Sequence, residues 1–139
     1  MEELIELVAQ HKWTRNCRRL NLGGETKMYG KRPYLVKGHY SNIVKSGPLL
    51  EAVQKMLPNI TELCLNKDVV CPPHVDKGNY GDSYILFLGD FEGGALVFFN
   101  GTRYESKNVW MGPFSGQDLH WNEPITSGSK ISIVAYSRK

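Results

Sequence analysis

Two histidines and an aspartate are the side chains of this sequence whose types and order could hold a metal ion. His74 and Asp76 stand two positions apart, and on an extended segment such side chains point to the same side of the chain. His120 follows later, near the start of the last predicted hairpin. Two imidazoles and one carboxylate on one face of an octahedron are typical ligands of non-haem Fe(II), and they leave positions open for substrate and oxygen. Because a short HxD match also arises by chance, these three residues alone predict an iron centre only weakly.

A lysine and a hydroxyl near the end of the sequence add a second element to this prediction. Lys130 opens the last predicted strand, and Ser132 lies two residues further on the same face. An ammonium beside a hydroxyl can bind a carboxylate. Taken alone, Lys130 would be an ordinary surface lysine. Taken with the three metal ligands, it predicts an anchor for a cosubstrate that carries a carboxylate.

The segments that must position these side chains are predicted to be mostly strands. Residues 2–12, and a segment that begins with Ser46 as its cap and stops before Pro58, carry apolar side chains at helical spacing. After Pro58 the apolar residues alternate with polar ones, as they do in strands. The dipeptide Asn100-Gly101 predicts a type I′ hairpin turn. The predicted strands cover residues 61–65, 83–88, 95–99, 102–105, 108–111 and 130–137.

The expected fold class is mainly β with flanking helices (α+β). Short strands separated by turns and preceded by two helices suggest a double-stranded β-helix, or jelly roll, with both helices packed on one side. We expect a single domain over residues 1–139, with a helical part at about 1–58 and a jelly-roll core at about 59–139. Residues 20–45 are expected to form a loop with short extended pieces.

Composition and charge narrow the class of protein. No apolar run approaches the ~18 residues of a membrane span, and the acidic N-terminus is unlike a signal peptide, so we expect a soluble intracellular protein, cytoplasmic or nuclear. Three cysteines without a framework spacing fit a reducing compartment. Residues 12–37 carry eight basic residues, one acid and interleaved aromatics, which is typical of a nucleic-acid contact or of a solvated face. Nothing implies an obligate protein partner.

The order of these residues resembles that of the double-stranded β-helix 2-oxoglutarate oxygenases. Within this family the sequence is most similar to the TET and J-binding-protein group. Residues 74–79 (HVDKGN) resemble the HxDxxN of that group, and residues 88–96 (LGDFEGGAL) resemble its LGxFxGGxL. Residues 128–136 resemble its closing strand. The likeness runs from about Leu63 to the end of the sequence, and LGDFEGGAL is its most specific part.

This resemblance implies a reaction and its cofactors. Fe(II) would bind His74, Asp76 and His120, and 2-oxoglutarate would chelate the iron through its keto acid end. The far carboxylate of the cosubstrate would meet Lys130 and Ser132. Reaction with O2 would convert 2-oxoglutarate to succinate and carbon dioxide while a C–H bond is hydroxylated. Ascorbate would help to keep the iron reduced.

The resemblance also implies a substrate. The TET-like group oxidises the 5-methyl group of pyrimidines in nucleic acid, which here points to 5-methylcytosine or thymine, in DNA rather than RNA. Tyr136 would stack on the flipped base, and Asn79 and Arg138 would also face the substrate. Stacking combined with an edge contact is what reading an extruded base requires. In simpler interpretations Tyr136 is a core aromatic at the end of a strand and Asn79 is a turn residue.

Two departures from the group leave the substrate open. Lys130 stands where TET-like enzymes usually have an arginine, and in this respect the sequence resembles prolyl hydroxylases. Arg138 stands where the group often has a histidine that contacts the base.

Two other functions therefore remain. A prolyl or other protein hydroxylase would use the same metal ligands and Lys130, with Tyr104, Trp110 or Trp121 lining a peptide groove. A non-catalytic cupin-like module would bind a metal, a small ligand or nucleic acid, and it would not turn over 2-oxoglutarate.

Overall fold

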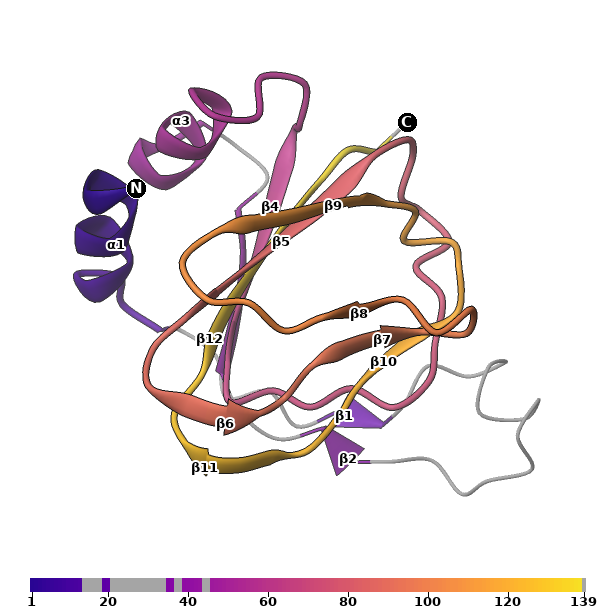
Figure 1. Ribbon diagram of the computed structural model, residues 1–139. Coiled ribbons are helices and arrows are strands. Elements are labelled where there is room, and N and C mark those ends of the chain that lie inside the picture. The colour runs from indigo at the N-terminus through magenta and orange to yellow at the C-terminus, as the bar shows by residue number, and fades with distance from the viewer. Residues whose placement is uncertain (14–18, 21–34, 37–38, 44–45, 139) are drawn as a thin grey trace.

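The computed structural model describes residues 1–13, 19–20, 35–36, 39–43 and 46–138 (Figure 1). The helices in this part of the chain are α1 (Glu2–Ala9) and α3 (Pro48–Gln54). The strands are β1 (Arg19–Leu20), β2 (Leu35–Val36), β3 (His39–Ile43), β4 (Glu62–Lys67), β5 (Ser83–Leu88), β6 (Phe91–Gly93), β7 (Leu96–Phe98), β8 (Arg103–Tyr104), β9 (Trp110–Phe114), β10 (His120–Asn122), β11 (Ile125–Gly128) and β12 (Ile131–Tyr136). The named strands pair antiparallel, so the described part of the chain is mainly β with two helices.

A five-stranded sheet in the order β3-β4-β12-β5-β9 is the largest layer of the fold. Strand β12 lies at its centre and pairs with β4 from Ile131↔Lys67 to Tyr136↔Glu62. On its other side β12 pairs with β5. Successive side chains of a strand point to opposite faces, so this sheet presents two surfaces of different composition.

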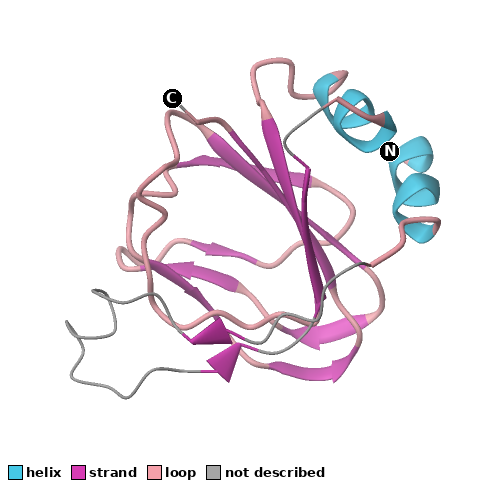
Figure 2. Cartoon of the chain, turned by 180° about the vertical axis from the view of Figure 1, so that it is seen from behind, coloured by secondary structure: helices cyan, strands magenta, loops and turns pink. Residues whose placement is uncertain are grey.

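The helices cover one face of the five-stranded sheet (Figure 2). Leu4 and Val8 of α1 and Val53 of α3 are buried against Leu65 of β4 and Ile133 of β12. This helix-side core is apolar, and none of the predicted metal or cosubstrate residues belongs to it.

The other face of the sheet lies opposite the smaller sheets β10-β7-β8 and β11-β6 (Figure 1). A second apolar cluster fills the inner side of the fold and includes Ile85 and Phe87 of β5 and Phe98 of β7. Val134 of β12 packs against this cluster, so its alternate neighbours Ser132 and Tyr136 share the inner face. The residues of chemical interest therefore lie between the two layers of sheet.

The longer apolar strands are found where they are predicted. Strand β5 has the predicted bounds, and β12 lies within the predicted residues 130–137. Strands β6, β10 and β11 are not predicted, because they have three or four residues each and are too short to show a pattern. Residues 39–43, expected within a loop with short extended pieces, form the edge strand β3.

Three local predictions were wrong. Helix α1 ends at Ala9 rather than at residue 12, and the N-cap of α3 is Gly47 rather than Ser46. A type I′ turn needs positive φ at both central residues, but the described non-glycine residues with positive φ are Asp68 and Asn108. The β7–β8 hairpin instead has a three-residue loop. Gly101, at φ 91°, donates its N–H to the Phe98 carbonyl, and the Phe98 N–H donates to the Thr102 carbonyl.

Two further predictions concern membrane spans and the basic stretch. Among the described residues, neither helix has the length and apolar character that crossing a bilayer requires. Most of the basic stretch 12–37 lies outside the described residues, so its role stays a prediction.

Candidate metal and cosubstrate site

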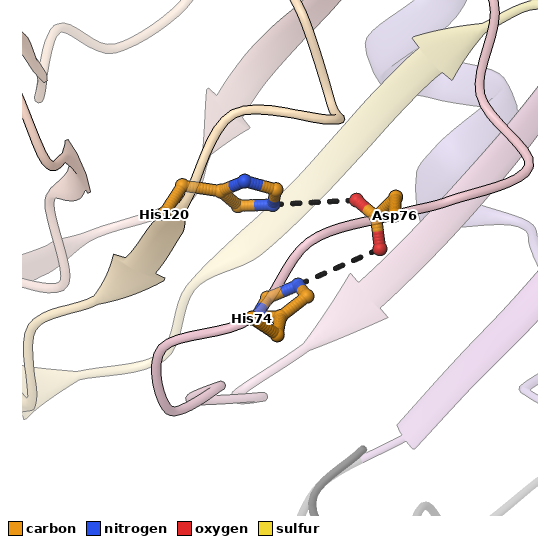
Figure 3. A group of neighbouring side chains, drawn as sticks. All are labelled: His74, Asp76 and His120. Atoms are coloured by element: carbon orange, nitrogen blue, oxygen red, sulfur yellow. Dashed lines mark ion pairs between the residues drawn. The ribbon is translucent and has the colours of Figure 1, made fainter. Parts of the chain in front are cut away.

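Backbone pairing brings the predicted metal ligands together (Figure 3). His74 lies between β4 and β5, and His120 is the first residue of β10. The two residues form an antiparallel bridge in which His74 N donates to His120 O at 2.9 Å and His120 N donates to His74 O at 3.0 Å. Asp76 N donates to Gly116 O at 2.8 Å. The structure thus places three side chains from two distant segments around one point. We refer to His74, Asp76 and His120 as the metal group.

The ligand atoms of these residues face one another. Nε2 of His74 lies 3.6 Å from Oδ1 of Asp76, and Nε2 of His120 lies 3.3 Å from Oδ2 of the same carboxylate. One ligand atom from each residue lies within 4.8 Å of the others. The histidine side chains are 11% and 6% exposed, whereas that of Asp76 is 37% exposed. The group therefore reaches solvent on the carboxylate side.

Carbonyl oxygens determine which nitrogen of each histidine carries the proton. Nδ1 of His74 lies 2.7 Å from Pro72 O, and Nδ1 of His120 lies 2.6 Å from Asp118 O. A carbonyl oxygen can only accept, so Nδ1 is the donor and the neutral ring presents a lone pair at Nε2. Two lone pairs and a carboxylate then converge on one point, an arrangement that a cation would stabilise. This donor set fits a divalent metal of the non-haem iron type.

Aromatic rings pack behind His120. The Phe98 ring lies 5.1 Å from the His120 ring, centroid to centroid, with 35° between the planes. Phe114 and Tyr104 extend the cluster, with centroids 5.2 Å and 6.0 Å from that of Phe98. This packing restrains the orientation of the imidazole, which a ligand must keep while a metal binds. Tyr104, predicted as a possible groove residue, thus belongs to the aromatic cluster around Phe98.

Lys130 points into the fold and not to the surface. The residue is 2% exposed, its Nζ donates to Gly94 O, and the ammonium lies 4.0 Å from the centroid of the Phe87 ring. Burial lowers the pKa of Lys130 to about 8, while the negative groups of Cys71 and Asp68 oppose this shift. Ser132 is also buried, and it lies on the same face of the chain two residues later. A lysine and a hydroxyl are therefore available side by side on the inner face.

The segment 88–96, the most specific part of the family resemblance, surrounds Lys130. A Cβ at Gly89 would lie 2.6 Å from Ser129 O, and a Cβ at Gly94 would lie 3.2 Å from the Lys130 ammonium. Asp90 O accepts a hydrogen bond from Ser129 N at 3.1 Å. Gly89 and Gly94 thus allow the close approach of this motif to residues 129 and 130. The sequence predicts the motif but not this role.

Asn79 and Arg138 lie together beyond the metal group. Their backbones form an isolated antiparallel bridge, and Asn79 is buried while the Arg138 side chain is 61% exposed. A Cβ at Gly116 would lie 2.6 Å from Nδ2 of Asn79, so the asparagine packs directly on the segment that holds Asp76. The Arg138 guanidinium lies over Gly78, 3.4 Å from where a Cβ would be.

Tyr136 is buried in the same region. Burial, followed by the negative charges of Glu62 and Cys64, raises the pKa of the Tyr136 phenol to about 12, and Asp76 adds to the shift. Glu62 is its cross-strand partner and lies 3.5 Å from Nε of Arg138. The Glu62 oxygen of this ion pair, Oε2, is buried, and among the described residues it accepts no hydrogen bond. Sequence reasoning missed Glu62, because a glutamate at the start of a strand is normally solvated.

The structure separates the two tryptophans proposed for a peptide groove. Trp110 pairs with Leu86 and packs against the helix-side core, so it lies on the opposite face of the sheet from Lys130. Trp110 is one of three alternatives predicted to line a peptide groove, and for this residue the prediction was wrong, because its position in β9 turns it to that core. Trp121 follows His120 in β10 and is half-buried.

Comparison with known proteins reveals likeness in structure but not in sequence. No protein-family model matches this sequence, and no curated protein matches it. A 2OG-Fe(II) oxygenase from Burkholderia pseudomallei is similar over 97% of this chain and 78% of its own, with a TM-score of 0.52 and 13% identity. A prolyl-4-hydroxylase from Pseudomonas putida is similar over 99% of this chain and 83% of its own, with a TM-score of 0.50 and 14% identity.

A third similar structure is NgTET1 in complex with 5mC DNA. It matches 58% of this chain with a TM-score of 0.50 and 21% identity, and the chain spans about a third of its length (34%). At these identities the three structures show the fold, which is that of 2OG-Fe(II) oxygenases. Together with the group formed by His74, Asp76 and His120, this fold supports an oxidoreductase.

Proposed function

We propose that this protein is an Fe(II)- and 2-oxoglutarate-dependent dioxygenase that hydroxylates a C–H bond. The observation that carries this proposal is the convergence of two Nε2 lone pairs and one carboxylate at the inner face, with both Nδ1 hydrogens donated to carbonyl oxygens. Such a set leaves half of an octahedral coordination sphere open.

The bound iron and 2-oxoglutarate would together supply the activation of oxygen, with succinate and carbon dioxide as coproducts. His74, Asp76 and His120 would hold the metal. Lys130 would donate hydrogen bonds to the far carboxylate of 2-oxoglutarate, helped by the hydroxyl of Ser132. Because the ammonium is buried beside aromatic rings, such a charge-assisted bond forms with little competition from water.

For the substrate we propose the 5-methyl group of a pyrimidine, 5-methylcytosine or thymine, in nucleic acid, with DNA favoured over RNA. Tyr136, Asn79 and Arg138 would contact the base. Their proximity to one another, and the Asp76 charge felt by the Tyr136 phenol, support this assignment. The 88–96 motif and the likeness to NgTET1 in complex with 5mC DNA also favour it.

A protein hydroxylase is the second candidate. The likeness to a prolyl-4-hydroxylase extends over most of both chains, and the proposed cosubstrate anchor, Lys130, is a lysine rather than an arginine. The half-buried Tyr104 of the aromatic cluster would then line the peptide groove.

Nucleoside mass spectrometry tests the substrate. The protein would be incubated with 5mC-containing or thymine-containing DNA, Fe(II), 2-oxoglutarate and ascorbate, alongside a reaction without 2-oxoglutarate. We expect a new nucleoside, heavier by one oxygen, that forms only with the cosubstrate. Succinate formation without a new nucleoside would refute the DNA assignment and favour an RNA or protein substrate. No succinate under any condition would favour the non-catalytic module.

A further inference from the structure

The end of β4 has an unusual backbone beside Lys130. The regular ladder between β4 and β12 ends at Ile131↔Lys67. The next residue, Asp68, has φ 57°, in the left-handed region that non-glycine residues rarely adopt. Asp68 N still donates to Lys130 O at 2.8 Å, as in an ordinary ladder. The Lys130 N–H, however, donates to the Asp68 side chain and not to the Asp68 carbonyl.

The Asp68 carboxylate holds residues 129 and 130 from one side. Its Oδ1 accepts a hydrogen bond from Lys130 N at 2.7 Å. The Ser129 hydroxyl lies 3.1 Å and 3.0 Å from the two carboxylate oxygens and donates to them. Hydrogen bonds to a charged acceptor are roughly twice as strong as neutral ones. The left-handed conformation of Asp68 thus coincides with a carboxylate turned back onto the start of β12.

The β5–β6 turn holds Ser129 from the other side. Asp90 O accepts from Ser129 N, and Gly89 leaves room for Ser129 O. The start of β12 is therefore held from two sides, Lys130 by Asp68 and Ser129 by Asp68 and the β5–β6 turn. The direction of the Lys130 side chain into the inner face follows from these contacts together with the Gly94 carbonyl that accepts from its ammonium.

We propose that Asp68 is a positioning residue for the cosubstrate anchor, which acts by holding the backbone of Lys130 and placing a negative charge near its ammonium. This inference rests on the proposed function, because it assumes that Lys130 binds 2-oxoglutarate. A side chain that is already oriented loses less conformational freedom when its ligand binds. Asp68 is not one of the three residues of the metal group.

Two substitutions separate the carboxylate from the backbone conformation. Asp68→Gly keeps the left-handed φ without strain and removes all side-chain bonds. Asp68→Asn tolerates the same φ and keeps one acceptor oxygen but not the charge. Asp82→Asn, which removes an exposed carboxylate from another turn, is the matched control.

The readout is 2-oxoglutarate binding with Mn(II) in place of iron, measured by calorimetry and by the increase in Tm that 2-oxoglutarate causes. For Asp68→Gly we expect a roughly tenfold rise in Kd, which corresponds to about 1.4 kcal/mol. Asp68→Asn should give a rise of about threefold, and the control none. In turnover with iron, the KM for 2-oxoglutarate should rise while kcat at saturation changes little.

A purely structural role predicts a different pattern. Asp68→Gly would then lower the Tm of the unliganded protein and leave the Kd for 2-oxoglutarate unchanged, which would overturn the inference. If Asp68→Gly does not fold, Asp68→Asn and Ser129→Ala decide by the same Kd. Wild-type protein that binds no 2-oxoglutarate would overturn the proposed function itself, and the inference with it.

Discussion

Each histidine of the metal group donates its Nδ1 hydrogen to a carbonyl oxygen two residues earlier in the chain, Pro72 for His74 and Asp118 for His120. The backbone around each histidine thus selects the tautomer that a metal requires. This makes Nε2 of both rings available without any further side chain.

Lys130 allows a prediction about pH. Because burial lowers its pKa to about 8, the free protein loses the ammonium as the pH rises through about 8. The charged form binds the carboxylate, so affinity for 2-oxoglutarate should be full below this pH and decline above it. Lys130→Ala should raise the Kd at least tenfold, about 1.4 kcal/mol, at pH 7.

Lys130→Arg is the control for this prediction, since a guanidinium stays charged at any pH used with proteins. Its affinity, whatever its size, should not fall between pH 7 and 9.5 when measured by calorimetry with Mn(II). An equal decline in wild type and Lys130→Arg would assign the pH effect to another group.

Among the elements, the 88–96 segment leads from β5 of the five-stranded sheet to β6 and β7 of the smaller sheets. On this path it contacts Lys130. Gly94 has φ 73°, and an added Cβ would lie 3.2 Å from the Lys130 ammonium. Gly94→Ala should therefore cost about 1–2 kcal/mol of stability through backbone strain and also raise the requirement for 2-oxoglutarate by displacing the lysine.

Gly101→Ala separates these two effects. Gly101 has a comparable φ of 91°, but nothing lies within 4 Å of an added Cβ. It should lose similar stability in urea denaturation while keeping the wild-type Kd for 2-oxoglutarate. A wild-type Kd in Gly94→Ala as well would show that the lysine is not displaced.

The sequence predicts the longer apolar strands, such as β5 and β12, because an apolar run of six residues between turn residues is typical of a buried strand. It does not predict β10, whose three residues become a strand through pairing with β7. The group of His74, Asp76 and His120, which the structure brings together, is predicted from residue type and spacing. Asp68 is not predicted, because its proposed role depends on a turn of the backbone that brings it to a residue far along the sequence.

For the molecule as a whole, the helix-side core and the candidate site lie on opposite faces of the five-stranded sheet. The helices cover one face (Figure 2), whereas Lys130 and Ser132 belong to the other face, beside the second apolar cluster. Val53→Ala, at a fully buried position of α3, should cost about 2 kcal/mol in the free energy of unfolding. Its Kd for 2-oxoglutarate at 20 °C should equal that of the wild type, and a large change would show that the two faces are coupled.

The most direct test of the metal group is iron-dependent succinate formation from 2-oxoglutarate, measured together with metal binding. His74→Ala and Asp76→Ala should each lose stoichiometric Mn(II) binding and reduce succinate formation by about 100-fold or more, while circular dichroism shows an intact fold. The control is His11→Ala, which removes a histidine that follows α1 and is distant in sequence from the metal group. This variant should behave as the wild type. Undiminished succinate formation in Asp76→Ala would contradict the assignment of this centre.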